Sequence, residues 1–166
     1  MSFYGLVDGS EKSLIQFLDQ LSGVDQVGAE ARAAMLATRS IKTTSKKWAI
    51  ETAISMVDLT TLEGADTPGK VRALCSKAVR PDPTDPTVPS VGAICVYNDM
   101  VAIARTHLDA IGGKHVPVAA VSTAFPSGRA SMEVKIQDTQ DAIDAGAAEI
   151  DMVIDRGAFL AGRYID

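Results

Sequence analysis

The sequence predicts an α/β protein whose parallel strands form part of a (β/α)₈-type barrel, preceded by helices. Four short apolar runs recur among its 166 residues, and they lie at 56–61, 92–99, 118–123 and 148–155. Their starts are roughly 26 to 36 positions apart, which is the length of a strand–helix–strand unit. Each run passes into polar residues at its far end, where parallel barrels gather their reactive side chains.

Residues 1–45 are predicted to be a helical N-terminal extension, and residues 46–166 the first half of the barrel. Leu14, Phe17 and Leu21 recur at helical spacing, and the alanine-rich stretch 27–39 follows as a second helix. A third helix is expected from about residue 45, with Trp48 on its buried side.

Helix signals separate the four predicted strands. Thr67 followed by Pro68 is a typical helix start, and the apolar spacing continues to Ala78. The proline-rich stretch 81–89 must be a loop, because proline interrupts helical hydrogen bonding. Further helices are expected over about 99–111 and 131–145, each followed by glycine, and another stretch opens at 156–164.

The alternation of side chains gives the strands two unlike faces. Ile94 and Val96 illustrate the apolar face, which suits packing under helices. An open sheet covered on both sides would need two apolar faces, so a closed barrel with helices outside fits better. The run 118–123 is too rich in alanine to be oriented. The opposite face carries small and polar residues, namely Asp58, Thr60, Cys95, Tyr97 and Asp151.

Composition excludes several classes of function. The net charge of −5 argues against general nucleic-acid or membrane-surface binding, and no apolar run approaches the length of a membrane span. Two cysteines without metal-ligand spacing favour a reducing, cytoplasmic location. No metal site and no cofactor are expected: His107 and His115 fall on a helix and a loop, and no glycine-rich nucleotide motif is present.

Asp58 and Asp151 are the candidate catalytic residues. Two carboxylates inside one barrel repel each other unless a cation lies between them or one keeps its proton. Lysine is the expected counter-charge, yet no lysine ends a predicted strand. The alternative is that each carboxylate simply accepts hydrogen bonds from the backbone or from threonine hydroxyls.

Several segments together resemble the deoxyribose-phosphate aldolases, in particular the longer-chain branch of that family. The resemblance covers about residues 46–164. It is carried by Asp-Leu-Thr-Thr-Leu at 58–62, Ala-Ile-Cys-Val-Tyr at 93–97, Phe-Pro-Ser-Gly at 125–128 and Gly-Ala-Ala-Glu-Ile-Asp-Met-Val-Ile at 146–154.

The resemblance implies a metal-free class I aldolase in deoxyribonucleotide catabolism. Such enzymes cleave 2-deoxy-D-ribose 5-phosphate to glyceraldehyde 3-phosphate and acetaldehyde through a lysine Schiff base. It implies that Asp151 donates and accepts protons and that Asp58 supports the charged cluster. It also implies that Thr60 and Cys95 line the substrate pocket.

The family segments that carry the Schiff-base lysine and a second lysine are absent from this sequence. A complete barrel needs roughly 250 residues, so the chain is expected to be the N-terminal half of an aldolase and inactive alone. A second hypothesis is a half-barrel module that self-associates or pairs with a C-terminal partner. A third is a different phosphosugar enzyme that uses Lys114, Arg129 or the amides of Ser127-Gly128 to bind phosphate.

Overall fold

The computed structural model describes residues 10–165, which divide into two units. One unit comprises residues 43–156 and contains every strand; the other combines the described residues up to 42 with those from 157 onward. The candidate site lies in the first of these, which is called the sheet unit below.

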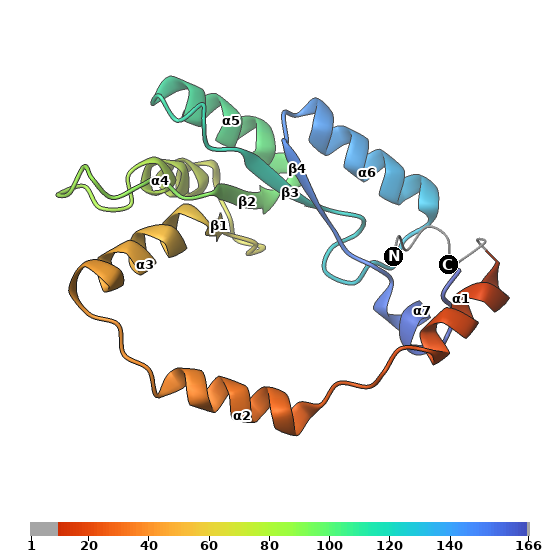
Figure 1. Ribbon diagram of the computed structural model, residues 1–166. Helices are drawn as coiled ribbons and strands as arrows, with labels where there is room; N and C mark the ends of the chain where they lie inside the picture. Colours follow the sequence, from red (N-terminus) through yellow and green to blue (C-terminus); the bar gives the residue numbers. More distant parts are fainter. Residues whose placement is uncertain (1–9, 166) are drawn as a thin grey trace. The chain divides into compact units, whose positions relative to one another are not determined.

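The sheet unit holds four parallel strands in chain order, as the sequence predicted (Figure 1). Each strand is shorter than the apolar run that predicted it, because the polar residues at its far end belong to loops. The strands are β1 (Asp58–Thr60), β2 (Ala93–Tyr97), β3 (Val118–Ser122) and β4 (Glu149–Met152).

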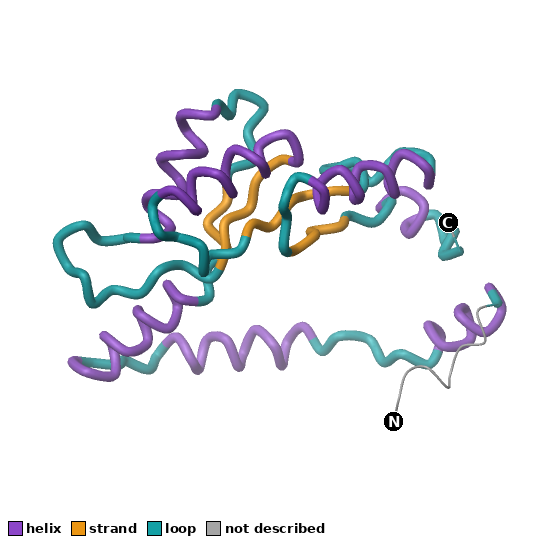
Figure 2. The backbone as a smooth tube through the Cα atoms, turned by 90° about the horizontal axis from the view of Figure 1, so that it is seen from above, coloured by secondary structure: helices purple, strands orange, loops and turns teal. Residues whose placement is uncertain are grey.

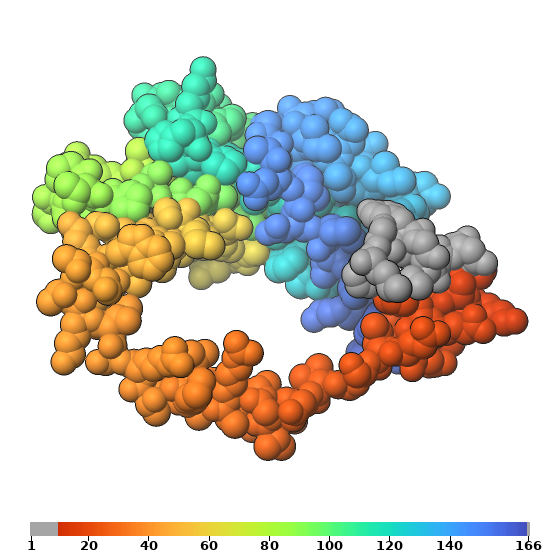
Figure 3. Space-filling model, viewed as in Figure 1, coloured from red at the N-terminus to blue at the C-terminus, as the bar shows by residue number. Residues whose placement is uncertain are grey.

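Three helices connect these strands and lie on one side of the sheet (Figure 2). They follow one another across the unit in the space-filling view (Figure 3). Their bounds are α4 (Pro68–Val79), α5 (Val101–Ala110) and α6 (Met132–Asp144), and the short 3-10 helix η2 (Asn98–Met100) precedes α5.

Side-chain caps explain where two of the helices begin. The hydroxyl of Thr67 accepts a hydrogen bond from the Lys70 amide, and Ser131 does the same for Val134. Each cap satisfies an amide that has no partner within the helix. The predicted starts of α4 and α6 are thereby confirmed.

The main core lies between the sheet and these helices. Its location confirms the predicted apolar face, and burial of these side chains supplies most of the stability of the unit. Val118 and Ala120 belong to it, which orients the strand that the sequence left unassigned. Its fully buried members include Val71, Cys75, Ile94, Val96, Ala104, Leu108, Val118 and Ala120.

Some predicted burial was wrong. Trp48 lies on α3 (Thr43–Ser55) with 68% of its surface exposed, and α3 has no buried residue. Of that helix, Ile54 packs against the core. The spacing predicted the helix α3 correctly, but no other helix of this unit covers the side on which Trp48 lies.

The second unit contains α1 (Glu11–Asp19), α2 (Gln26–Ala37) and the residues that follow the start of α7 (Arg156–Leu160). The side chain of Asp25 caps α2 by accepting from the amide of Gly28. Neither α1 nor α2 buries a residue. Among the described helices, none has the length and apolar character to span a membrane.

Candidate functional site

The predicted site residues share the face of the sheet opposite the main core. The register pairs Thr60 with Cys95 and Val121 with Asp151, and laterally paired residues of parallel strands point to the same side. Asp58 lies two residues before Thr60 on β1 and therefore shares its face. This face carries a small second cluster in which Cys95, Ala119 and Val121 are buried.

A hydrogen bond joins two of these residues across the sheet. The thiol of Cys95 on β2 donates to Oδ2 of Asp151 on β4 at 3.4 Å. The strand between them, β3, carries Ala119 at the position that pairs with Cys95. Neighbouring strands are about 4.8 Å apart, so side chains from β2 and β4 can meet only where the residue between them is small.

This environment raises the pKa of the Cys95 thiol from 9.0 to about 12. Burial is the largest cause; the hydrogen bond to Asp151 and the negative charges of Asp151 and Asp58 raise the pKa further. Cys95 therefore stays protonated at neutral pH and serves as a hydrogen-bond donor rather than a nucleophile.

The sequence pattern predicts that Asp58 and Asp151 lie inside a barrel, where they would need a cation between them. In the structure the side chains of both are exposed, so burial does not force either to find a cation. Asp151 is bonded by a thiol rather than by the backbone or threonine. The hydroxyl of Thr60 donates to the backbone carbonyl of Asp58 at 2.9 Å.

Glu149 is a third carboxylate on this face and was not among the predicted site residues. It pairs with Ala119 and lies two residues before Asp151 on β4. The strand alternation that oriented Asp151 also orients Glu149, so the signal was present in the sequence. None of the strand residues on this face is basic.

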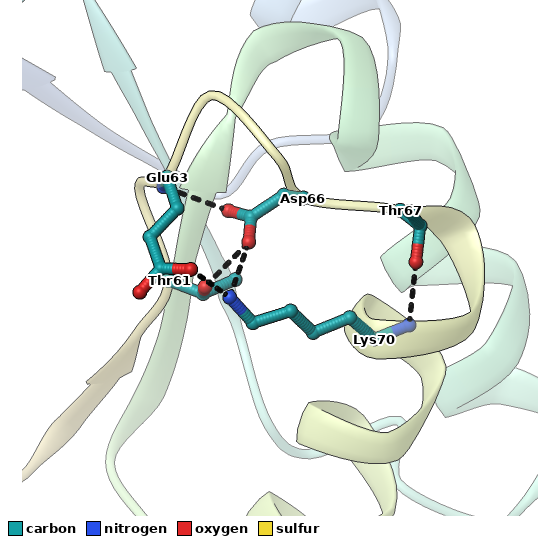
Figure 4. Close-up of polar contacts among 5 residues, drawn as sticks. All are labelled: Thr61, Glu63, Asp66, Thr67 and Lys70. Carbon is teal, nitrogen blue, oxygen red and sulfur yellow. Dashed lines mark hydrogen bonds and ion pairs between the residues drawn. The ribbon is translucent and has the colours of Figure 1, made fainter.

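Lys70, which follows β1, lies near the sheet edge but is already paired (Figure 4). Its ammonium group contacts Oδ1 of Asp66 at 2.7 Å and Oε2 of Glu63 at 2.6 Å. Hydrogen bonds to Asp66 and then Glu63 raise the pKa of Lys70, which holds it protonated and unable to attack a carbonyl. Asp66 also accepts from the hydroxyl of Thr61, so this cluster fixes the loop between β1 and α4.

The other predicted cations are not brought together. Lys114 precedes β3 and Arg129 follows it, so the two lie on loops at opposite ends of that strand. His107 contacts the hydroxyl of Ser76 at 3.1 Å, between the outer helices α4 and α5. The described lysines all lie on helices or loops, as the sequence predicted.

A cavity of about 470 Å³ opens beside this face, at the carboxyl ends of β2 and β3. Tyr97, Val121 and Phe125 form its apolar wall, and Asp138 of α6 lines its polar side. Burial favours the neutral form of Asp138, but hydrogen bonds from Asn98 and the Ala124 amide outweigh it and lower the pKa of this carboxyl. The cavity is within the size range of small-molecule sites.

The four parallel strands and the helices that cover them form part of a (β/α) barrel. Asp151 lies near the carboxyl end of β4, whereas Asp58 and Glu149 are the first residues of β1 and β4. No family model matches the chain. A mouse deoxyribose-phosphate aldolase is 36% identical over 139 residues, which are 77% of this chain and 42% of that protein. Over this region the chain is a homologue of the deoxyribose-phosphate aldolases, and the sequence-based recognition is confirmed.

Solved structures agree with this assignment. A Coccidioides immitis structure, provisionally assigned to the same family, has a TM-score of 0.60 and 26% identity, over 70% of this chain and 42% of that one. A tetrameric deoxyribose phosphate aldolase from Aeropyrum pernix shares the fold, with a TM-score of 0.54 and 22% identity over 69% and 49%. The chain spans 36–42% of the length of the curated relatives it matches.

Proposed function

We propose that this chain supplies the acid–base half of a deoxyribose-phosphate aldolase site. In this proposal Asp151 donates and accepts the protons of carbon–carbon cleavage, and Asp58 supports the charge of the cluster. Thr60 and Cys95 line the substrate pocket. A Schiff-base lysine on polypeptide outside these 166 residues supplies the nucleophile, so the chain alone does not turn over 2-deoxyribose 5-phosphate.

The observation that carries the proposal is the bond from the Cys95 thiol to Asp151 at 3.4 Å. It holds an exposed carboxylate at the carboxyl end of a barrel strand, where catalytic groups of such barrels gather. The homology of the surrounding segments to aldolases supplies the reaction type. The acidic character of the face supports a positively charged group, such as an iminium ion, as its partner.

The test combines this chain with the lysine-bearing remainder of a relative. The chain is co-expressed with the part of the mouse aldolase that it does not cover, and acetaldehyde release from 2-deoxyribose 5-phosphate is measured. Borohydride trapping followed by mass spectrometry then locates any Schiff base. We expect release and an adduct only in the mixture, with the adduct on the mouse segment.

Asp151→Asn in the mixture is the matched control, because it keeps the shape of the side chain and removes its acid–base function. We expect it to assemble normally and to lose release. A stoichiometric adduct on any lysine of this chain would contradict the proposal. Release unaffected by Asp151→Asn would contradict the assigned role.

A half-barrel that associates without catalysis is the second candidate. Its support is that β1 and β4 are the two edges of the sheet and that Met152 on β4 is 64% exposed. Pairing two identical copies face to face would bring Asp58, Glu149 and Asp151 of both copies together without a cation. A discrete dimer in size-exclusion chromatography, stable at low salt, would favour this module over the aldolase half.

The substrate that we propose is a small phosphosugar. The net charge of −5 argues against nucleic acid or a membrane surface as a partner. Both cysteines are free thiols, which fits a reducing cytoplasm. We expect the whole enzyme to form a homo-oligomer, as the Aeropyrum pernix aldolase does.

A further inference from the structure

Thr123 joins the exit of β3 to the exit of β4 through its side chain. The regular ladder ends at the pair Ser122–Met152. One step further, the amide of Val153 donates to Oγ1 of Thr123 at 2.7 Å, and the same hydroxyl lies 2.8 Å from the carbonyl of Val153. The hydroxyl has one proton, which it gives either to that carbonyl or to the carbonyl of Ser122 at 2.7 Å.

The backbone around Thr123 is strained and held from several sides. Thr123 and Ala124 have φ of 63° and 64°, a region that residues with a side chain seldom adopt. The Ala124 amide donates to Asp138 on α6 at 3.4 Å. Gly128, with φ of 72°, ends the turn so close to the carbonyl of Ile154 that no Cβ would fit. Such strain persists only where the surroundings determine the conformation.

The side-chain bond comes directly after the last pair of the ladder, Ser122–Met152. Thr123 has left-handed φ, and its hydroxyl accepts the hydrogen bond from the Val153 amide. Val153 is two residues beyond Asp151, so this bond fixes the backbone on the far side of the proposed proton-transfer residue. Without it, Val153, the first residue after β4, would lose the hydrogen bond that its amide donates to Thr123.

We infer that Thr123 is a positioning residue for Asp151: its hydroxyl holds the end of β4 so that the Asp151 carboxylate meets the Cys95 thiol. The importance of this for catalysis rests on the proposed function, whereas the geometry does not. Thr123 itself touches neither the thiol nor the carboxylate in the contacts described. Its effect is transmitted through two residues of backbone.

The S–H stretching band of Cys95 reports directly on the bond to Asp151. Cys75→Ala leaves Cys95 as the one thiol of the chain. In this background, Asp151→Ala gives the band position of a thiol without that acceptor. We expect Thr123→Val, which keeps the shape and removes the hydroxyl, to move the band by at least half of that interval. Thr123→Ser should restore the original position.

Thr87→Val is the matched control, because it removes a hydroxyl that bonds only within a loop, to Asp85. It should leave the band unchanged. A band that stays in place in Thr123→Val while it moves in Asp151→Ala overturns the inference, as does a band that Asp151→Ala fails to move.

Amide hydrogen exchange tests the same bond in the wild-type chain, without a variant. The Val153 amide should exchange slowly, and exchange as fast as in an unstructured peptide overturns the inference.

Activity in the combined enzyme separates this inference from the proposed function. Thr123→Val should lower kcat at least tenfold with KM unchanged, and Thr123→Ser should recover it. If the band moves as expected but Asp151→Asn does not affect turnover, the positioning role stands and the proposed function fails. If the band stays in place in Thr123→Val while Asp151→Asn abolishes turnover, the proposed function stands and the positioning role of Thr123 fails.

Discussion

The thiol of Cys95 lies where the influence of both candidate carboxylates can be measured. Its pKa is raised to about 12, by burial first and by Asp151 next, whereas the pKa of Cys75 is raised to about 11 chiefly by burial. The two cysteines therefore differ in their carboxylate neighbours more than in their burial. A variant at Asp151 should affect one thiol and spare the other.

We expect Asp151→Asn to speed the reaction of Cys95 with a small thiol reagent at pH 9 by several-fold. Removing the negative charge lowers the pKa of the thiol, and each unit gives about tenfold more of the reactive thiolate. The measurement is the modification rate of each cysteine by mass spectrometry. Cys75 is the internal control. Equal acceleration of both thiols would point to a loosened fold and contradict the electrostatic explanation.

The Asp66 carboxylate makes the stability of the loop after β1 depend on pH. Its pKa is lowered from 3.8, first by the hydrogen bond to Lys70, against burial, and then by the Glu63 amide and Thr61. A carboxyl with a lowered pKa in the folded state adds stability above its unfolded pKa, and this stability disappears as the pH falls through the lowered value. Asp66→Asn should therefore weaken the dependence of unfolding on pH below about 4.

Urea unfolding of both proteins between pH 2 and neutral pH measures this effect. The wild type should lose stability on acidification more steeply than Asp66→Asn, and the two curves should approach each other at the acid end. Asp82→Asn is a useful comparison, because Asp82 has a lowered pKa through Thr84 but no lysine partner. Parallel curves for wild type and Asp66→Asn would contradict the prediction.

At the scale of elements, the turn between β3 and α6 depends on one glycine. Gly128 and Gly112 both have positive φ, at 72° and 79°. A Cβ at Gly112 would meet nothing within 4 Å, whereas at Gly128 it would overlap the backbone of Ile154. The pair therefore separates the cost of the backbone conformation from the cost of the clash.

We expect Gly112→Ala to lower the free energy of unfolding by about 1–2 kcal/mol, the ordinary cost of left-handed φ. Gly128→Ala should cost more, because the exit of β4 must also move. Urea midpoints measure both. The larger effect at Gly128 should be accompanied by faster amide exchange at Val153. Equal costs at the two positions would show that the turn does not press on β4.

Local sequence signals predicted the elements well and their surroundings poorly. Thr67 and Ser131 begin helices for reasons that lie within four residues of each, so the sequence alone suffices. Whether Trp48 is buried depends on what packs against α3, which helical spacing cannot reveal. The strand at 118–122 was predicted, but not which of its faces is buried, because its alanines fit either face. Packing against α5 and α6 determines that face.

The same distinction applies to the site. Strand alternation placed Asp58, Thr60, Cys95 and Asp151 on one face, and it places Glu149 there too. The bond between Cys95 and Asp151 could not be predicted, because it depends on the register of three strands and on the small size of Ala119. Thr123 was missed because left-handed φ at a residue other than glycine has no sequence signature.

At the scale of the whole molecule, the sheet has one well-packed face and one acidic, partly exposed face. The helix-covered face contains nearly all of the fully buried side chains. Asp58, Glu149 and Asp151 contribute no ion pair among the described residues. Stability and the proposed chemistry are therefore carried by opposite faces of the same strands.

This separation predicts that the acids can be neutralised at little cost to folding. The double variant Asp58→Asn, Asp151→Asn should change the free energy of unfolding of the chain by no more than about 0.5 kcal/mol, as is usual for exposed positions. The loss of acid–base function should lower turnover of the combined enzyme by about 100-fold or more. Asp144→Asn, on the exposed surface of α6, should leave both unchanged. A double variant that unfolds readily would mean that the acids stabilise the sheet, and unimpaired turnover would mean that the chemistry lies elsewhere.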